Sequence, residues 1–312
     1  MKINSRSFEK QYKNHLSNFR EWEKMVDEEA LVYPENFGPR MSMDETSLHN
    51  GELWTVITNK DAKGGKGCLA ALIKGTKNKV VSDALSKVPV SKLMGVKEIT
   101  VDLANSMDWI CRTNFMNAVI TADRFHVQGI VHEAVQEMRI VERRKAIDEE
   151  NELMLQARKE GWKFEPARYE NGDTKKQLLA RGRYLLFKPA YKWSDSQRKR
   201  AAILFRAFPK LQQAYDLSMR FRAIFELSQS DAEAASRLSE WLVEARASQL
   251  ETMVSASQTI HNNYGKILNF FRNRATNASA ESFNAKLKGF RSLVRGVRDI
   301  RFFLFRVEKL YA

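Results

Sequence analysis

Strand patterns gather between residues 40 and 123, and their order is the feature that most constrains the fold. Three short segments rich in apolar, β-branched and aromatic residues come first, and they predict an antiparallel meander over 41–46, 52–58 and 68–73. A helix with Ser82 as its N-cap follows. Strand and helix then alternate, with a strand over 98–102, a helix over 107–117 and a strand over 118–123. Strands that alternate with helices pair in parallel, so we expect a mixed sheet.

The order of these elements, β-β-β-α-β-α-β, is that of an RNase H-like core, which we place at 40–126. Residues 1–39 are polar and charged and predict an N-terminal helical segment. Apolar residues recur at helical spacing between charges from 127 to 265, which predicts an α-helical insertion. Residues 266–312 predict basic C-terminal helices that complete the core. The predicted fold class is therefore α/β, an RNase H-like mixed sheet core with a large all-α insertion and a basic C-terminal helical region.

Charge and composition narrow the class of partner. The chain has 312 residues, with 52 Lys and Arg against 38 Asp and Glu, which gives a net charge of +14. Such an excess favours a polyanionic partner, most commonly nucleic acid. No apolar run approaches the roughly 20 residues that span a bilayer, and the polar start does not resemble a signal peptide, so we expect a cytoplasmic protein without membrane contact. Two distant cysteines, Cys68 and Cys111, argue against a zinc site or a disulfide and predict free buried thiols.

Three carboxylates stand where a hard cation could be held. Asp44 lies within or at the end of the first predicted strand, Asp102 ends the fourth, and Glu281 comes early on a basic helix. In the predicted topology the first and fourth strands are neighbours, and a helix that returns after the insertion can bring Glu281 to them. Each acid alone is more often a turn, cap or ion-pair residue, so the prediction depends on their conjunction. Phosphodiester cleavage with two Mg²⁺ ions needs a few well-placed carboxylates of this kind.

Two sequence blocks resemble a known family. Residues 121–127, TADRFHV, resemble the DRFHV element of the ISL-three family of insertion-sequence transposases, members of the DDE superfamily, and residues 276–288 resemble that family's TNxxxExxNxxIK helix. Met43-Asp44-Glu45 resembles the family's first-strand DE motif, and Val101-Asp102 its VTxD strand. The resemblance extends from about residue 40 to the end of the chain. It implies that Asp44, Asp102 and Glu281 are catalytic and bind two Mg²⁺ or Mn²⁺ ions.

The same motifs leave alternatives open for the second ligand. Asp123 and His126 form a DxxH pair, which is similar to an element that supports the site in related transposases, and Asp123 is the rival of Asp102. Strand order favours Asp102, and we interpret His126 as a supporting residue. Further side chains are expected to orient Glu281 or to contact DNA phosphates, namely Asn277, Asn284, Lys286, Lys288, Arg291, Arg295 and Arg298. A helix cap is an equal alternative for Asn277.

The prediction is a DNA transposase that cleaves insertion-sequence ends by two-metal-ion catalysis and joins the freed 3′-hydroxyl to target DNA. The alternatives are an RNase H-like nuclease without joining activity and a catalytically inactive DNA-binding relative. Longer relatives carry an N-terminal zinc-finger and helix-turn-helix region, whereas about 40 residues precede Asp44 here. We therefore expect a separate small helix-turn-helix protein to recognise the ends, with a truncated copy as the other explanation. The resemblance also implies self-association on paired ends and a location at the bacterial nucleoid.

Overall fold

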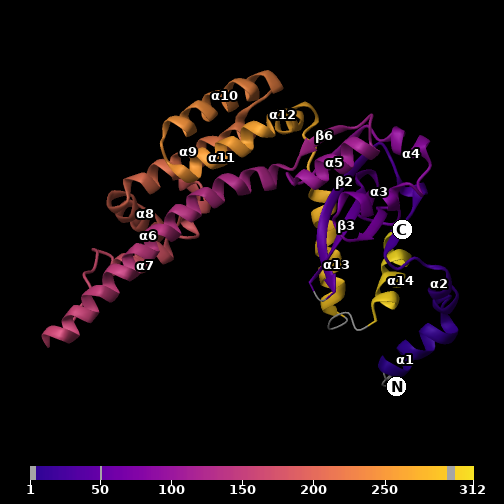
Figure 1. Ribbon diagram of the computed structural model, residues 1–312, viewed down its shortest axis with the longest axis horizontal. Helices are drawn as coiled ribbons and strands as arrows, with labels where there is room; N and C mark the ends of the chain where they lie inside the picture. The colour runs from indigo at the N-terminus through magenta and orange to yellow at the C-terminus, as the bar shows by residue number, and fades with distance from the viewer. Residues whose placement is uncertain (1–4, 50, 294–298) are drawn as a thin grey trace. The chain divides into compact units, whose positions relative to one another are not determined.

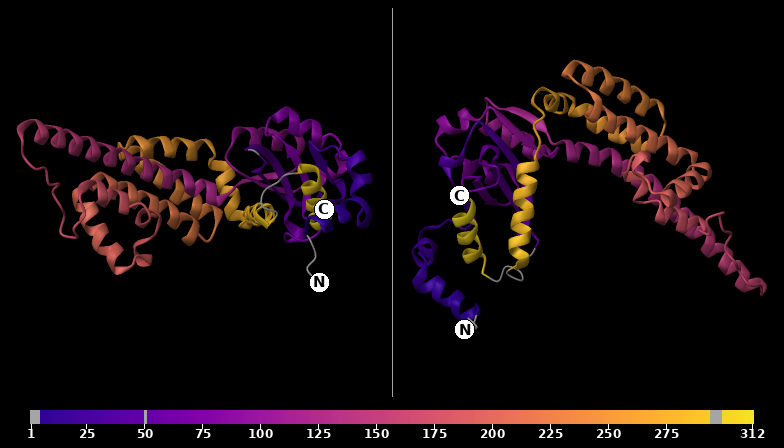
Figure 2. Two further views of the ribbon diagram at one scale, coloured as in Figure 1. Left: turned by 90° about the horizontal axis from the view of Figure 1, so that it is seen from below. Right: turned by 180° about the vertical axis from the view of Figure 1, so that it is seen from behind.

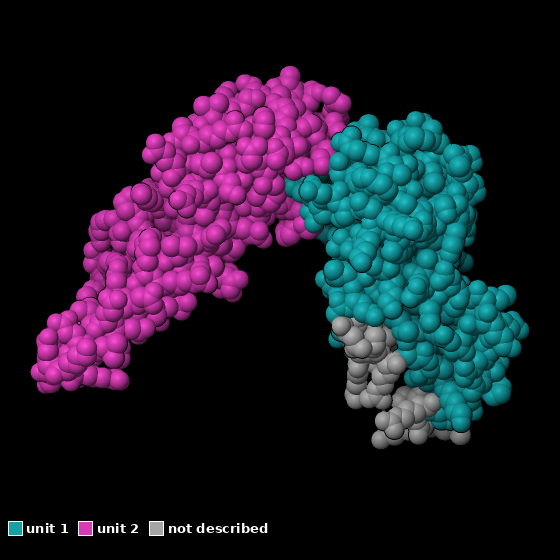
Figure 3. Space-filling view, viewed as in Figure 1, with its two compact units in different colours: residues 1–123, 273–312 teal, residues 124–272 magenta. Residues whose placement is uncertain are grey.

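The computed structural model describes residues 5–49, 51–293 and 299–312 (Figure 1). The chain divides into two compact units, which Figure 3 shows in different colours. Residues 1–123 and 273–312 form the first, which we call the sheet unit, and residues 124–272 form the second, the helical unit. No helix in these described ranges is both long and apolar enough to cross a membrane.

The sheet unit consists of strands with helices on both faces. Its strands are β1 (Ala30–Val32), β2 (Arg40–His49), β3 (Glu52–Asn59), β4 (Leu69–Lys74), β5 (Glu98–Val101) and β6 (Val119–Ala122). Its α-helices are α1 (Ser5–Gln11), α2 (Phe19–Met25), α3 (Asn78–Leu85), α4 (Val90–Gly95), α5 (Asn105–Asn114), α13 (Ala278–Leu293) and α14 (Ile300–Tyr311). Short π- or 3₁₀-helical turns are η1 (Tyr12–Leu16), η2 (Pro34–Asn36) and η3 (Lys60–Ala62).

The strand order across the sheet is β1-β4-β3-β2-β5-β6. β2, β3 and β4 form the predicted antiparallel meander, and β5 and β6 continue the sheet in parallel beside β2. The order β4-β3-β2-β5-β6 is that of an RNase H-like sheet, which confirms the predicted fold class. Because β2 pairs directly with β5, the prediction that the strands of Asp44 and Asp102 are neighbours is also confirmed.

Each face of the sheet has its own apolar core, because side chains alternate between the faces along a strand. On one face, Met41, Met43 and Ile99 pack with buried side chains of α3, α4 and α5. On the other face, side chains of β3 and β4 pack with α13 and α14. Cys68 lies in the second core and Cys111 in the first, both buried and free, as the sequence predicts.

The helical unit confirms the prediction of an all-α segment after the sheet, since no strand occurs among its residues, all of which are described. Helices α9 and α11 pack along α6, which Figure 2 shows from two directions. The unit contains α6 (Arg124–Glu160), α7 (Lys175–Arg181), η4 (Leu185–Phe187), η5 (Ala190–Lys192), α8 (Asp195–Ala207), α9 (Pro209–Leu227), α10 (Asp231–Ala247), α11 (Glu251–Asn262) and most of α12 (Tyr264–Asn273).

Two local features differ from the sequence prediction. Strand β1 was not expected, and it extends the sheet by pairing Leu31 with Leu72 of β4. The prediction that Ser82 is an N-cap is wrong, because α3 begins a turn earlier at Asn78. Ser82 lies inside the helix, where its hydroxyl accepts a hydrogen bond from Asn114 Nδ2 at 2.9 Å.

Candidate active site

The sheet register brings three aspartates into one row. Asp44 is the fifth residue of β2, whereas Asp102 and Asp123 directly follow β5 and β6. Ser42 pairs with Thr100 and Val101 pairs with Ala122. Continued in the same register, Asp44 lies opposite Asp102, and Asp102 lies opposite Asp123. Neighbouring strands are about 4.8 Å apart, so the row is about 10 Å wide.

The first two acids of this row are half-buried and already hydrogen-bonded. Asp44 Oδ1 accepts the backbone N–H of Glu45 at 2.8 Å, and Asp44 Oδ2 accepts Asn284 Nδ2 at 2.6 Å. Asp102 Oδ1 accepts the backbone N–H of Leu103. Each carboxylate is therefore oriented by a neighbouring donor, which fixes the direction in which its remaining lone pairs point.

Glu45 is a further acid beside the row, and the sequence patterns did not assign it to the site. Burial raises the pKa of the Glu45 carboxyl, and the charges of Asp102 and Asp44 raise it further. Alternation along β2 directs Asp44 and Glu45 to opposite faces of the sheet, so strand logic alone gave no reason to group them. Its position next to Asp44 in the DE motif was the signal that could have identified it.

Helix α13 crosses the row of aspartates and is fixed to both of its ends. The Asn277 backbone N–H, just before the helix, donates to Asp123 Oδ1 at 3.2 Å, and Asn284 donates to Asp44 as described above. The seven residues between these two anchors rise about 10 Å along a helix, which matches the width of the row. Glu281 lies between the anchors on the same face, four residues after Asn277 and three before Asn284, and its side chain is exposed. The helix is therefore fixed to the row both before and after Glu281 in the sequence.

The two ends of the row differ in environment. Asp123 is 3% exposed, whereas Asp44 and Asp102 are only half-buried. Asn277 is fully buried, and neither atom of its side-chain amide has a hydrogen-bond partner among the described residues. Asn277 therefore does not cap α13 through its side chain. Asn284 Oδ1 is buried without a partner in the same described set. Unsatisfied polar atoms of this kind are usually met by water or a ligand.

A half-buried lysine lies on the same face of the sheet. Lys60 Nζ donates to Glu98 Oε1 at 2.6 Å and to Thr100 Oγ1 at 2.5 Å. Burial lowers the pKa of the Lys60 amine, although the charges of Glu98 and Asp123 oppose this effect. With Arg40, Arg274 and Thr276 it lines a cavity of about 340 Å³ at the start of α13. Sequence reasoning missed Lys60, which stands in a short turn after β3 without a recognisable motif.

The basic residues predicted to bind DNA have different surroundings. Lys286 Nζ donates to the Gly64 carbonyl at 2.7 Å, and Arg291 Nη1 donates to the Ser47 carbonyl at 3.4 Å. Lys288 is exposed on α13. Arg295 and Arg298 lie outside the described residues. His126 belongs to α6 of the helical unit, where its ring meets the edge of the Phe125 ring at 6.0 Å between centroids.

The donor atoms of the row fit a hard divalent cation. Asp44, Asp102 and Glu281 offer carboxylate oxygens, which Mg²⁺ and Mn²⁺ prefer over sulfur ligands. Within the described ranges, no three His, Cys, Asp or Glu side chains are already arranged to hold an ion. The exposed Glu281 side chain would therefore have to turn toward the two aspartates when an ion binds. The chemistry of the site fits such ions, whereas the complete ligand set is not preassembled.

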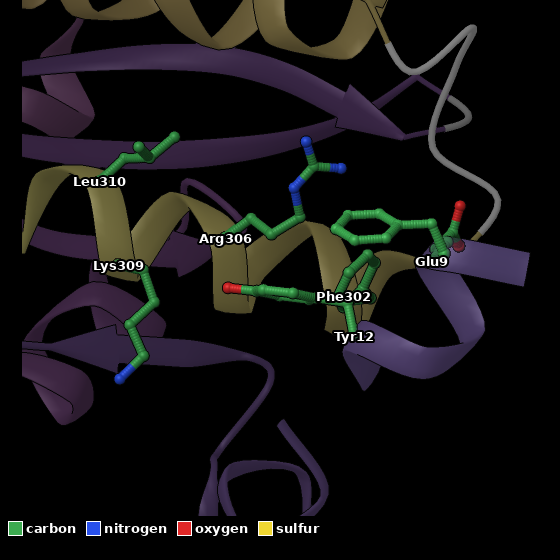
Figure 4. Close-up of a pocket in the computed structure, with 7 residues that line it drawn as sticks. Glu9, Tyr12, Phe302, Arg306, Lys309 and Leu310 are labelled. Carbon is green, nitrogen blue, oxygen red and sulfur yellow. The ribbon is translucent and has the colours of Figure 1, made fainter. Parts of the chain in front are cut away.

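A second cavity of the sheet unit has a different character. It has a volume of about 360 Å³ and lies between the N-terminal helices and α14 (Figure 4). Tyr12 and Phe302 form an edge-to-face pair at 6.2 Å, and burial lowers the pKa of the neighbouring Arg306. Among the residues that the structure describes, Glu9 is the one carboxylate that lines it. This cavity lacks the grouped acids that metal-dependent chemistry requires.

Comparison with known proteins agrees with this geometry. The family model for DDE transposases of the ISL-three type matches residues 41–307, whereas no match is found among curated proteins. The matched range begins in β2, includes β5 and β6, and contains all of α13. It therefore contains every acid of the row together with Glu281. Since this match covers most of the 312 residues, the chain belongs to the ISL-three family of DDE transposases, the enzymes that move insertion sequences by DNA recombination.

Proposed function

We propose that this transposase cleaves the ends of an insertion sequence and joins them to target DNA, using Asp44, Asp102 and Glu281 as ligands of two Mg²⁺ or Mn²⁺ ions. The observation that carries the proposal is the hydrogen bond from Asn284 to Asp44, 2.6 Å long and between residues 240 apart in sequence. It ties the helix of Glu281 to the strand of Asp44. Asp102 directly follows the strand that pairs with β2, so the proposal takes its three acids from distant segments of the chain.

We assign the second ligand to Asp102 and not to Asp123. Asp102 is half-buried and follows the strand that pairs with β2. Asp123 is almost completely buried, and one of its oxygens accepts the Asn277 amide that begins α13. A carboxylate engaged in this way supports the helix that carries Glu281. We therefore propose that Asp123 is a positioning residue, and we keep His126 as a supporting residue.

The residues of the chain have separate tasks in this proposal. When bound, divalent ions activate the attacking oxygen and stabilise the leaving oxygen of the phosphodiester. Asn284 holds the Asp44 carboxylate in one orientation, and the Asn277 amide holds the start of the helix. In the first reaction water replaces a 3′-oxygen on phosphorus and frees a 3′-hydroxyl. In the second that hydroxyl replaces a 3′-oxygen of the target, so each step exchanges one P–O bond for another.

The basic side chains of the C-terminal region are proposed to contact DNA phosphates around the reacting strand. Lys288, Arg295 and Arg298 would make direct contacts. For Lys286 and Arg291 we propose that they fix α13 to the sheet, because each already donates to a main-chain carbonyl of the sheet region. The side-chain amide of Asn277 has no hydrogen-bond partner among the described residues, so it is available to a water molecule or to the nucleic acid.

Cleavage and joining of labelled insertion-sequence ends in Mg²⁺ or Mn²⁺ test the proposal. Asp44→Asn, Asp102→Asn and Glu281→Gln should each abolish cleavage while DNA affinity stays near that of the wild type. Asp123→Asn should retain Mn²⁺ binding, measured by titration, and lose thermal stability. If Asp123→Asn loses Mn²⁺ binding and Asp102→Asn keeps it, the assignment is reversed. Cutting without joining would instead indicate a nuclease, and no metal-dependent cleavage at all would indicate an inactive DNA-binding relative.

We also propose, from the family resemblance, that the chain self-associates on paired ends and works with a separate small helix-turn-helix protein that recognises them. Mass measurement of the protein with and without end DNA tests the first part. Inverted repeats beside the gene and a short reading frame encoding a helix-turn-helix test the second. A monomer on paired ends contradicts the first part, and direct sequence-specific end binding by this chain contradicts the second.

A further inference from the structure

The helical unit contains a cavity of about 740 Å³ that has no part in the proposed chemistry. Its walls come from α6, α9 and the segment that includes η4. All of these elements belong to one compact unit. The volume falls within the range of about 300–1,000 Å³ that is typical of small-molecule sites, so a nucleotide fits inside it.

Positive charge exceeds negative charge in the lining of this cavity. Arg139 is 6% exposed, and its guanidinium donates to Gln136 Oε1 at 2.7 Å and to the Leu179 carbonyl at 3.1 Å. Both acceptors are neutral, and Arg139 has no carboxylate within ion-pair distance in the part of the chain that the structure describes. A buried cation with neutral partners alone is costly, and an anion supplied by a ligand would offset that cost.

Two more arginines and a free amide donor line the same space. Arg183 is exposed at the rim, where its guanidinium lies 5.4 Å from the Tyr184 ring centroid. Arg222 pairs with Glu226 at 2.7 Å on α9. Gln128 Nε2 is buried and has no hydrogen-bond partner among the described residues. Glu133 is the one acid of the lining, so donors clearly outnumber acceptors.

Part of the lining is aromatic. The His132 and Phe187 rings meet edge to face with 5.6 Å between centroids. Burial lowers the pKa of the His132 imidazole, and the charge of Arg222 lowers it further, so the ring is neutral at pH 7. Phe125, at the start of α6, is 71% exposed and also lines the cavity. Aromatic faces beside arginines suit a nucleobase beside its phosphate, since bases stack on such rings without regard to sequence.

We propose that this cavity binds one unpaired nucleotide of a DNA strand, with its phosphate at Arg139 and Arg183 and its base against the His132 and Phe187 rings. The proposal rests on DNA as the substrate of this family and does not depend on which carboxylates bind metal. It assigns to the helical unit a contact with single-stranded DNA that the sheet unit does not provide.

Fluorescence anisotropy of the full chain with labelled single-stranded and duplex oligonucleotides tests the proposal, in EDTA so that catalysis cannot contribute. Arg183→Gln should weaken single-strand binding about ten-fold, because a charge-assisted hydrogen bond is lost, and should reduce the salt slope of log Kd by about one. Arg144→Gln is the matched control. Arg144 is exposed on α6, a helix that contributes other residues to the cavity, but Arg144 itself does not line it. Equal affinities of Arg183→Gln and Arg144→Gln would overturn the proposal.

Two further variants keep the test decisive. Arg139→Gln should weaken single-strand binding at least as much as Arg183→Gln does. If Arg139→Gln fails to fold, the variant of the exposed Arg183 still tests the proposal. Phe187→Ala should weaken binding of a normal single strand about ten-fold and leave an abasic strand unaffected. An equal loss for both strands, or an equal loss for duplex DNA, would overturn the unpaired-base assignment. Competition by inorganic phosphate as strong as that by thymidine monophosphate would also overturn it, because the cavity would then be a general anion site.

These outcomes are independent of the carboxylate assignment. Asp44→Asn should bind the single strand as the wild type does, because Asp44 belongs to the sheet unit and the measurement excludes metal. Loss of cleavage with intact binding would support the catalytic proposal alone. If the wild type cleaves DNA and all cavity variants keep the wild-type affinity for single-stranded DNA, only the proposal of a nucleotide site is wrong.

Discussion

At the scale of single residues, Asn284 has the most specific task that the site offers. Its amide reaches Asp44 Oδ2 at 2.6 Å, and it is itself 6% exposed, so no other orientation is easily available to it. Side chains that orient metal ligands typically change metal affinity or activity by about 10–100-fold when they are lost. We therefore expect Asn284→Ala to lower metal-dependent cleavage by about that factor and to raise the Mg²⁺ concentration required.

The control for this prediction lies two residues earlier on α13. Ser282 is exposed, so Ser282→Ala should leave both rate and Mg²⁺ dependence unchanged. Thermal melts should show that both variants are folded, with Asn284→Ala less stable by about 1.5–3 kcal/mol at most, because one hydrogen bond to a charged group is lost. A normal Mg²⁺ dependence in a folded Asn284→Ala protein would show that Asp44 does not need this donor.

The acids of the site differ in how far their positions could be predicted from sequence. The adjacency of Asp44 and Asp102 follows from strand order alone, because short connections leave few ways to arrange β2 and β5. The approach of Glu281 does not follow, since about 150 residues of helical unit intervene and only the motif resemblance suggested its return. Lys60 was missed because its relation to the row depends on packing across the sheet, which no local pattern encodes. Glu45 was missed although the DE motif places it next to Asp44.

At the scale of elements, α13 combines two kinds of basic residue that sequence could not separate. Lys286 donates to the carbonyl of Gly64, a residue with a φ of +73° in the turn between β3 and β4. Lys288 is exposed two residues later. We expect Lys286→Gln to lower the free energy of unfolding by about 1 kcal/mol with little effect on DNA affinity. Lys288→Gln should do the reverse and reduce the salt slope of DNA binding by about one.

Urea unfolding and DNA-binding isotherms at several salt concentrations separate the two effects. Each variant serves as the control for the other, because both remove one positive charge from the same helix. If both variants lower DNA affinity equally and neither is destabilised, Lys286 is a phosphate contact and its bond to Gly64 has no structural weight.

Contacts between residues distant in sequence also explain why one strand and the start of one helix were not predicted correctly. Strand β1 has only three residues and follows the acidic pair Glu28 and Glu29, so its sequence carries no strand signal of its own. It forms because β4, buried along almost its whole length, presents an unpaired edge to it. Helix α3, by contrast, was predicted in type and wrong at its start, since a polar turn before an apolar run can belong to either loop or helix.

Helices α7 and α8 are joined by a fully buried acid that makes the helical unit sensitive to low pH. Asp173 pairs with Arg181 of α7 and with Arg200 of α8, the latter at 3.1 Å. Burial acts to raise the pKa of Asp173, but the hydrogen bonds from Arg200 and Arg181 outweigh it, and the pKa lies below its ordinary value. The unfolded chain therefore takes up the proton first. The stabilisation is complete above the ordinary carboxyl pKa of about 3.9 and is lost as the pH falls through the lower folded value.

Urea unfolding between pH 3 and pH 6 checks this dependence. Asp173→Asn should be less stable than the wild type at pH 6 by about 3 kcal/mol, and the difference should shrink as the pH falls toward 3. Glu152→Gln, an exposed acid on α6, should follow the wild-type curve. A difference between Asp173→Asn and wild type that stays constant down to pH 3 would show that the ion pairs do not titrate in this window.

At the scale of the whole molecule, the sheet unit has apolar cores of its own. The cores on the two faces of the sheet contain residues of the sheet unit only. The chain leaves this unit after Asp123 and has returned by Asn277, whose amide lies 3.2 Å from Asp123 Oδ1. The helical unit is therefore an insertion between two points that are close together, a position at which folded domains tolerate large changes.

Replacement of residues 124–272 by a linker of about eight Gly and Ser residues, which spans roughly 15 Å, should therefore give a folded sheet unit. We expect one cooperative thermal transition and Mn²⁺ binding close to that of the full chain, because Asp44, Asp102 and Glu281 all remain. Single-strand DNA affinity should fall at least as far as in Arg183→Gln, since the whole cavity has been removed. A linker variant with Asp44→Asn is the control for metal binding. If the linker variant is unfolded, the sheet unit needs the helical unit in order to fold, and the prediction is wrong.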